Sequence, residues 1–286
     1  MLTAIRRAGL CETAERAPPS PLHYTRFVGT VFMPSKDVCV HLVPQLLEPS
    51  RLKGSIAVVI DVLRATTTII HALAASCTAV RPCVEIEEAK ALAATLPKRG
   101  VLLGGERGGK RIPNFMLGNS PREYTAKNCK GKTLILTTSH GTRAIQRVIE
   151  AQRVLIAGFV NFSAVCEQLH CDLRPVHVVC AGYAGEPCME DTLLAGALVE
   201  YFCETMDVRL NDSARLAWDC FENHGRILLG ALQISQGGEH LKEIGCTDDI
   251  PLAADVDKFA IVPELRRDPL RIEVTSAGIV KQRWAK

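Results

Sequence analysis

The stretch SIAVVIDVL, residues 55–63, followed by ATTTIIHALAA, residues 65–75, decides the fold class of this 286-residue chain. The first segment is a continuous apolar run rich in β-branched residues, which is typical of a strand buried on both faces. The second segment has the length and composition of a helix. A strand that passes directly into a helix is the basic unit of an α/β fold.

The same change from strand to helix recurs along the chain. Strands are predicted at 37–43, 78–83, 101–106, 133–139, 153–160 and 175–182, and helices at 85–96, 141–151, 161–170 and 190–202. After Asp212 the chain becomes more helical, and it closes with two strand candidates at 258–265 and 271–280. This alternation predicts an α/β fold with a largely parallel or mixed sheet and helices on both faces. Two lobes would divide near residues 172–178.

Residues 1–32 show no sustained period and contain Pro18, Pro19 and Pro21. We expect a disordered extension, or a start codon placed too early, because Met33 precedes the first strand signal. Residues 33–286 are then the folded domain.

Composition excludes several classes of protein. The chain is 47% hydrophobic and 23% charged, as in soluble globular proteins. A net charge of +3 and only 5% aromatic residues argue against binding nucleic acid. No apolar run reaches the roughly 18 residues that span a membrane. The twelve cysteines include no C-x-x-C pair and sit mostly among apolar neighbours, so we expect reduced core thiols and a cytoplasmic protein.

The stretch GGERGGKRIPNFMLGNSPRE, residues 104–123, combines glycines with several cations and has little periodicity. Glycines let the backbone approach a ligand closely, and such long loops are often functional. Ser120, Pro121 and Glu123 form a helix-start pattern with a capping box. Asn119 would lie at the positive end of that helix, where anions bind.

In open α/β sheets, ligands bind outside the carboxyl ends of the strands. The predicted strands are followed there by acids, cations, hydroxyl groups and an imidazole, namely Asp61, Arg64, Glu106, Arg107, Thr138, His140, Glu190 and Asp191. Carboxylates suit a hard cation such as Mg²⁺. Arg64, Arg107, Lys110 and Arg111 suit a substrate with several negative charges.

Each residue also has a structural interpretation. Asp61 would serve as a helix cap, Glu190 and Asp191 favour the first turn of a helix, and Arg111 would be a solvated charge. His140 would act as an acid–base group or as a positioning residue. Cys180 lacks a histidine-containing partner motif and is interpreted as a buried thiol.

Two short motifs, one typical of nucleotide-binding loops and one of aspartyl phosphatases, match only in part, and the neighbouring residues argue against both. Gly104–Lys110 satisfies G-x-x-x-x-G-K, but Arg111 replaces the serine or threonine that binds magnesium, and Pro113 follows where a helix should begin. DVLRATT resembles the start of aspartyl phosphatases, yet Leu63 replaces their second aspartate.

Several motifs in order resemble the 2-phosphosulfolactate phosphatase family. They are DVLRATTTI (61–69), GGERGG with LGNSPREYT, TT-x-x-GTRA (137–144), CAG (180–182) and EDTLLAGALV (190–199). The resemblance runs from about Met33 to the end of the chain. It implies an α/β fold and magnesium-dependent hydrolysis of 2-phospho-3-sulfolactate to sulfolactate and phosphate, a step of coenzyme M biosynthesis.

The sequence departs from the family pattern at three positions. His140 stands where the family usually has asparagine, and Asn114 and Met116 stand where it usually has glycine and aspartate. The resemblance therefore supports a phosphatase more strongly than it supports a particular substrate.

Together these features predict a magnesium-dependent phosphatase that acts on a small polyanionic substrate, with a homodimer allowed. We assign Asp61, Glu106 and Asp191 to the metal, and Asp61, Arg64 and His140 to catalysis. We expect the substrate to be bound by Arg107, Lys110, Arg111, Asn119, Ser120 and Thr138. Attack by water and a phospho-aspartate intermediate both remain open. The alternatives are a phosphatase for a related phospho-hydroxy acid, a nucleotide hydrolase and a non-catalytic protein that binds polyanions.

Overall fold

The computed structural model describes residues 35–279. The strands are β1 (Lys36–His41), β2 (Ile56–Ile60), β3 (Ala79–Cys83), β4 (Val101–Arg107), β5 (Lys110–Arg111), β6 (Thr133–Thr137), β7 (Arg153–Ala157), β8 (Val176–Cys180), β9 (Val208–Leu210), β10 (Ile261–Arg267) and β11 (Leu270–Ile279). The α-helices are α1 (Ala65–Ala74), α2 (Ile86–Ala94), α3 (Ala126–Cys129), α4 (Gly141–Arg147), α5 (Phe162–His170), α6 (Met189–Thr205), α7 (Asp212–His224), α8 (Leu228–Ile234), α9 (Gln236–Glu243) and α10 (Asp249–Ala253). Short 3₁₀ turns include η4 (Pro121–Glu123).

One mixed sheet runs through the described residues in the order β5-β4-β6-β3-β11-β10-β7-β2-β8-β1-β9. Within it, β4, β6 and β3 form one parallel block, and β7, β2, β8, β1 and β9 form another. The antiparallel hairpin β10–β11 lies between the two blocks. The predicted α/β class with a mixed sheet is therefore confirmed, and the last two strand candidates complete the middle of the sheet.

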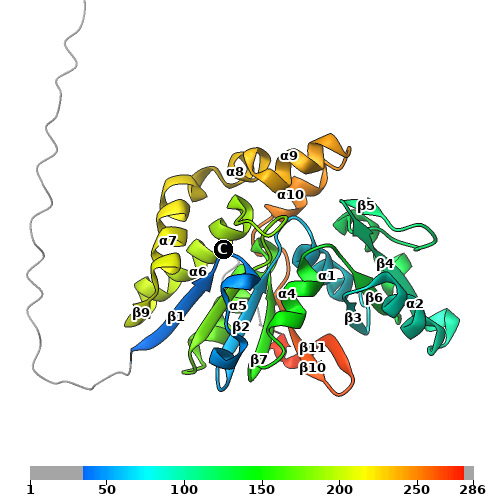
Figure 1. Ribbon diagram of the computed structural model, residues 1–286, viewed down its shortest axis with the longest axis horizontal. Helices are drawn as coiled ribbons and strands as arrows, with labels where there is room; N and C mark the ends of the chain where they lie inside the picture. The colour runs from blue at the N-terminus through cyan, green and yellow to red at the C-terminus, as the bar shows by residue number, and fades with distance from the viewer. Residues whose placement is uncertain (1–34, 280–286) are drawn as a thin grey trace, which may run out of the picture. The chain divides into compact units, whose positions relative to one another are not determined.

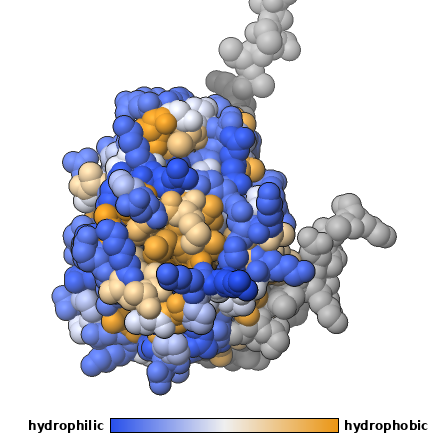
Figure 2. All heavy atoms as spheres, turned by 90° about the vertical axis from the view of Figure 1, so that its right-hand side faces the viewer, coloured by the Kyte–Doolittle hydropathy of each residue, from blue (hydrophilic) through white to orange (hydrophobic). Residues whose placement is uncertain are grey.

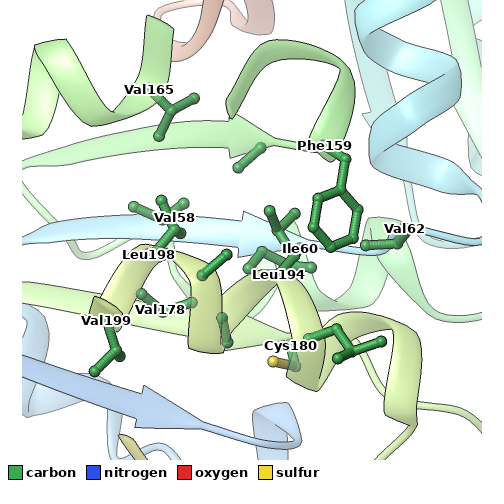
Figure 3. Close-up of a cluster of buried hydrophobic side chains, with 14 of the residues drawn as sticks. Val58, Ile60, Val62, Phe159, Val165, Val178, Cys180, Leu194, Leu198 and Val199 are labelled. Carbon is green, nitrogen blue, oxygen red and sulfur yellow. The ribbon is translucent and has the colours of Figure 1, made fainter. Parts of the chain in front are cut away.

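Helices cover both faces of the sheet, and β2 is therefore buried on both of its faces. Ile56, Val58 and Ile60 pack with α5 and α6 on one face, whereas Ala57 and Val59 pack with α1 and α4 on the other. Figure 3 shows Val58 and Ile60 beside Leu194 and Leu198 of α6. This two-sided burial explains why the deciding stretch is apolar throughout.

A third, smaller cluster lies around α2, β4 and β6 and includes Ile112, Phe115 and Ile135. Figure 2 views the molecule from the side that lies to the right in Figure 1, where α2 and β5 lie. That surface is largely hydrophilic, with apolar residues gathered near its centre.

The stretch 104–123, which its lack of periodicity marked as a long loop, contains regular structure. Its first part is a tight hairpin in which Glu106 pairs with Arg111 and Arg107 with Lys110. The turn residues Gly108 and Gly109 have φ of 56° and 75°, which suits the hairpin turn in which both central residues take positive φ. The run of glycines therefore serves the hairpin, which the lack of periodicity did not reveal.

A helical turn does begin after Ser120 as predicted, with Pro121 in its first position, but the predicted capping box does not form. Pro121 and Glu123 bound only the 3₁₀ turn η4, and Ser120 accepts no capping hydrogen bond. Instead, Ser120 Oγ donates to Asp249 Oδ1 at 2.5 Å, and Glu123 Oε2 accepts from the Gly118 amide. With both cap partners engaged elsewhere, the turn does not continue as an α-helix.

The described residues, 35–279, fall within one compact unit. The segment 172–178, considered above as a lobe boundary, leads from α5 into the sheet strand β8 within that unit. The predicted extension, residues 1–32, lies outside the described residues. None of the described helices is long and apolar enough to cross a membrane.

Helices α8, α9 and α10 run across one end of the sheet (Figure 1). They pack on one another and on η4 and α6. This end is where the polar residues that follow the strands gather, so the C-terminal helices form one wall of the site described next.

Candidate active site

A small cavity of about 60 Å³ lies where the carboxyl ends of β2, β4, β6 and β8 meet. Its lining includes five predicted residues, Asp61, Arg64, Glu106, Asn119 and His140. Ser139 and Tyr183 line it as well, together with Gly237, His240 and Leu241 from α9. The rule that ligands bind at the carboxyl ends of strands thus places these residues together.

Asp61 lies between β2 and α1 and is 8% exposed. Its Oδ1 accepts a hydrogen bond from the Ala65 amide at 2.9 Å, which satisfies the first amide of α1, although Arg64 is the N-cap residue. Its Oδ2 accepts no hydrogen bond from the described residues, and a Cβ at Gly141 would lie 2.6 Å from it. Burial raises the pKa of Asp61, and the nearby charge of Glu106 adds to this effect. One oxygen of Asp61 is therefore structural and the other is available for chemistry.

Arg64 is held by two fixed contacts. Its Nη1 forms a salt bridge of 2.7 Å with Asp249 Oδ2, and its Nη2 donates to the Gly109 carbonyl at 2.8 Å. The positive charge that Arg64 brings to the cavity is thus balanced by a buried carboxylate from α10. Arg64 connects the start of α1, the β4–β5 turn and the C-terminal helices.

Glu106 joins two loops of the site. Its Oε1 accepts from the Ser139 amide and its Oε2 accepts from the Gly109 amide, both at 2.7 Å. Ser139 Oγ donates to the same Oε2 at 3.1 Å. Both carboxylate oxygens therefore fix the backbone of the two turns, and Glu106 carries its negative charge into the cavity lining.

His140 precedes α4, and its Nε2 accepts a hydrogen bond from the Ala184 amide at 3.1 Å. An acceptor at Nε2 places the proton of the neutral ring on Nδ1. The His140 ring lies 5.3 Å from the Tyr183 ring, which lies 5.6 Å from the ring of His240. These three rings line one side of the cavity.

The predicted substrate residues Asn119, Ser120 and Thr138 lie in different settings. Asn119 lines the cavity, and its Oδ1 is buried with no hydrogen-bond partner among the described residues. Ser120 is bound to Asp249. Thr138 is 1% exposed, and its Oγ1 accepts from the Thr142 amide at 3.1 Å. Of the three, Asn119 alone offers an unused polar atom to a ligand.

The other predicted cations do not line the cavity. Arg107 donates to the carbonyls of Glu106 and Val84 and to Thr137 Oγ1. Lys110 and Arg111 lie exposed on β5. Their place in substrate binding stays a prediction.

Glu190 and Asp191 lie in the first turn of α6 and are both buried. Asp191 Oδ1 accepts from the Val62 amide at 2.8 Å, and its Oδ2 accepts from the Gly182 amide at 3.1 Å. Glu190 Oε2, by contrast, has no hydrogen-bond partner among the described residues. A Cβ at Gly237 would lie 2.0 Å from Glu190 Oε1, so Glu190 lies directly behind that part of the cavity lining. Burial raises the pKa of both acids, and the Asp61 charge contributes.

The free oxygens around the cavity fit a hard cation. Within residues 35–279, no three His, Cys, Asp or Glu side chains are arranged as a ready set of metal ligands. Mg²⁺ commonly binds through only one or two carboxylates, with water and substrate phosphate completing its shell. Asp61 Oδ2 and Asn119 Oδ1 are oxygens of this kind in the lining, and Glu190 Oε2 is another, from a residue behind the lining. The oxygens of Asp191 and Glu106 each accept a hydrogen bond and keep a second lone pair.

Two other predicted features lie in the core. Cys180 is fully buried in the cluster that Figure 3 shows, and burial raises its pKa well above the ordinary value. His71 packs edge-on against Phe259, 4.9 Å between ring centroids. Neither residue lines the cavity.

Sequence reasoning missed Tyr183, Gly237, His240 and Asp249. Apart from Tyr183, which follows β8, they come from the C-terminal helices, where no strand end marked a site. Asp249 could have been noticed only as one of two adjacent aspartates before a short apolar run, which is a common pattern.

The chain matches the sequence profile described as 2-phosphosulpholactate phosphatase over residues 41–268. It is 41% identical over 213 residues to a protein of Symbiobacterium thermophilum named probable 2-phosphosulfolactate phosphatase, covering 74% of this chain and 91% of that protein. Proteins with the same name from Caldanaerobacter subterraneus and Prochlorococcus marinus are 36% and 38% identical. These alignments cover 77% and 76% of this chain and 91% and 92% of those proteins. This chain therefore belongs to the 2-phosphosulfolactate phosphatase family.

Proposed function

We propose that this protein hydrolyses 2-phospho-3-sulfolactate to 3-sulfolactate and phosphate, as a magnesium-dependent phosphatase. Family membership and the names of the relatives support a phosphoric monoester hydrolase. The observation that carries the proposal is Asp61, whose Oδ1 is fixed by the Ala65 amide while its Oδ2 is left unbonded in the cavity.

The chain's own residues supply binding and orientation. Arg64, held by Asp249, and the turns fixed by Glu106 keep the cavity in one shape, which is what positioning of a reacting phosphate requires. Asp61 is the charged group nearest the reaction, either as the nucleophile or as a group that holds the metal. His140 Nδ1–H is a hydrogen-bond donor of the site.

Magnesium would be held by Asp61 with Glu190 and Asn119, whose oxygens lack partners among the described residues. Glu106 and Asp191, the other two predicted ligands, use their oxygens to hold backbone amides, and their role as ligands stays a prediction. When bound, the ion would offset charge on the phosphoryl oxygens. A place in coenzyme M biosynthesis, a cytoplasmic location and a homodimer stay predictions.

Phosphate release tests the proposal. The purified chain is given 2-phospho-3-sulfolactate, 2-phospholactate or ATP, with Mg²⁺ and then with excess chelator. We expect release from the sulfolactate ester, its loss on chelation, and none from ATP. Release from ATP would favour a nucleotide hydrolase. Tight binding of the sulfolactate ester without release of phosphate would favour a non-catalytic anion-binding protein. Phosphate release that continues in excess chelator would contradict the proposed dependence on magnesium.

A further inference from the structure

The cavity around Asp61 is too small for the whole proposed substrate. A single water needs about 10–15 Å³ of cavity volume, so about 60 Å³ holds one small group such as a phosphate. The substrate also carries a sulfonate and a carboxylate, and these two anionic groups need another place.

The charge of this cavity leads to the same conclusion. Asp61 and Glu106 contribute negative charge to its lining, and the positive charge of Arg64 is balanced by Asp249. Magnesium would compensate a phosphate there. Two further anions would meet no free cation among the described lining residues, since Arg107, Lys110 and Arg111 do not belong to it.

A second, larger cavity of about 300 Å³ adjoins the first, and both are lined by Ser139 and His140. Beyond His140, this second cavity is lined by Gln45, Arg143, Arg147 and Gly185. Its volume is in the range of small-molecule sites. The shared residues place this second cavity next to the one that Asp61 lines.

Arg143 and Arg147 can bind an anion, because their guanidinium groups are not fully engaged within the protein. They are four residues apart on α4 and therefore lie on the same face of the helix. Arg143 pairs with Glu85 at 2.8 Å, but both side chains are more than half exposed, and such surface pairs are weak. Arg147 donates to the Leu47 carbonyl and forms no ion pair with a described carboxylate. Both guanidinium groups retain N–H donors that match a sulfonate or carboxylate.

Resting on the proposed function, we propose that the cavity lined by Arg143 and Arg147 is the subsite for the sulfonate and carboxylate of the substrate. The reacting phosphate lies beside Asp61, and His140 separates the two subsites. In this arrangement, α4 supplies positive charge to the site.

The test compares Arg143→Met and Arg147→Met with Arg209→Met. Arg209 is a matched control, because it is an exposed arginine in a surface pair with Asp37 and lines neither cavity. Loss of one charge-assisted hydrogen bond corresponds to about tenfold or more in binding. We therefore expect KM for the sulfolactate ester to rise at least about tenfold in the two α4 variants, with kcat within about twofold and the control unchanged.

Binding of 3-sulfolactate, measured by calorimetry, separates this inference from the proposed function. The α4 variants should bind 3-sulfolactate at least about tenfold more weakly than wild type, while inorganic phosphate binds equally to all. An active enzyme whose variants bind 3-sulfolactate like wild type would overturn the subsite alone. A wild type that releases no phosphate, yet binds 3-sulfolactate through these arginines, would overturn the proposed function and keep the subsite. Folding of each variant is checked by its thermal midpoint.

Discussion

Arg64 Nη1 lies 2.7 Å from Asp249 Oδ2, and the two side chains are only 4% and 2% exposed. They are far apart in the sequence, one following strand β2 and the other beginning α10. Asp249 Oδ1 also accepts from Ser120 Oγ, so a single carboxylate holds both a cavity residue and the loop after β5. The C-terminal helices are therefore part of the construction of the site.

Replacing Asp249 with asparagine should cost both stability and activity. Breaking a buried ion pair leaves an uncompensated charge and typically costs about 3–5 kcal/mol. We expect the free energy of unfolding, measured by urea denaturation, to fall on this scale, and kcat/KM to fall because Arg64 is no longer fixed.

Asp248→Asn is the matched control. Asp248 is adjacent in sequence but pairs with Arg122 at the surface, where ion pairs contribute about 0–1 kcal/mol. Equal effects of the two substitutions would show that the Arg64–Asp249 pair does not organise the site.

His140→Asn tests whether His140 transfers a proton. Asparagine can place an N–H where Nδ1–H lies, but its side chain is too short to reach the position of Nε2, so only the contact with the Ala184 amide is lost. We expect phosphate release to change less than about tenfold, with the same pH profile, whereas His140→Ala, which removes both groups, should lower it further. A loss of hundredfold or more in the asparagine variant, with an altered pH profile, would assign proton transfer to His140, since acid–base catalysis supplies about 10²–10⁴-fold.

Asp191→Asn should act mainly on stability. The substitution places an N–H group against one of the two backbone amides that Asp191 now accepts. A buried donor without an acceptor costs about 1–3 kcal/mol. We expect the urea midpoint to fall accordingly while Mg²⁺ affinity, measured by titration of the folded variant, changes little. A large loss of Mg²⁺ affinity with normal stability would show that Asp191 is a ligand.

The raised pKa of buried Glu190 makes the stability of the fold decrease as pH rises. Burial and the Asp61 charge raise the pKa of Glu190 above its ordinary value of 4.5, so the folded state keeps this proton to higher pH than the unfolded chain. The contribution of Glu190 to stability is thus full below about pH 4.5 and is lost as pH rises through its folded pKa. In metal-free protein, Glu190→Gln should therefore lose less stability than wild type as pH rises from 5 to 8. Parallel denaturation profiles would contradict this.

Much of the fold was predictable because the deciding residues act locally. The apolar run at Ile56–Ile60 and the helix-forming segment after it occupy β2 and α1 as expected. The position of β10 and β11 between the two parallel blocks was not predictable, because it depends on pairing with β7 and β3, which are distant in sequence.

The site was predictable where a residue follows a strand and hidden where it depends on long-range partners. Asp61, Glu106 and His140 were found by position alone. The sequence could not show that Ser120 would bind Asp249 rather than cap a helix, or that Arg107 would donate to backbone carbonyls. A charged residue in a loop looks the same whether it faces a ligand or the protein's own backbone.

Phosphate release by Asp61→Asn tests the central claim most directly. The amide keeps an oxygen for the Ala65 N–H, so stability should fall by about 1 kcal/mol or less. The charge on the second oxygen is lost, and we expect turnover of 2-phospho-3-sulfolactate to fall at least roughly a thousandfold, as for loss of one preorganised charged group. A Mg²⁺ titration of the same variant tells a metal ligand, whose loss weakens binding, from a nucleophile. A folded Asp61→Asn protein with near-normal turnover would contradict the account.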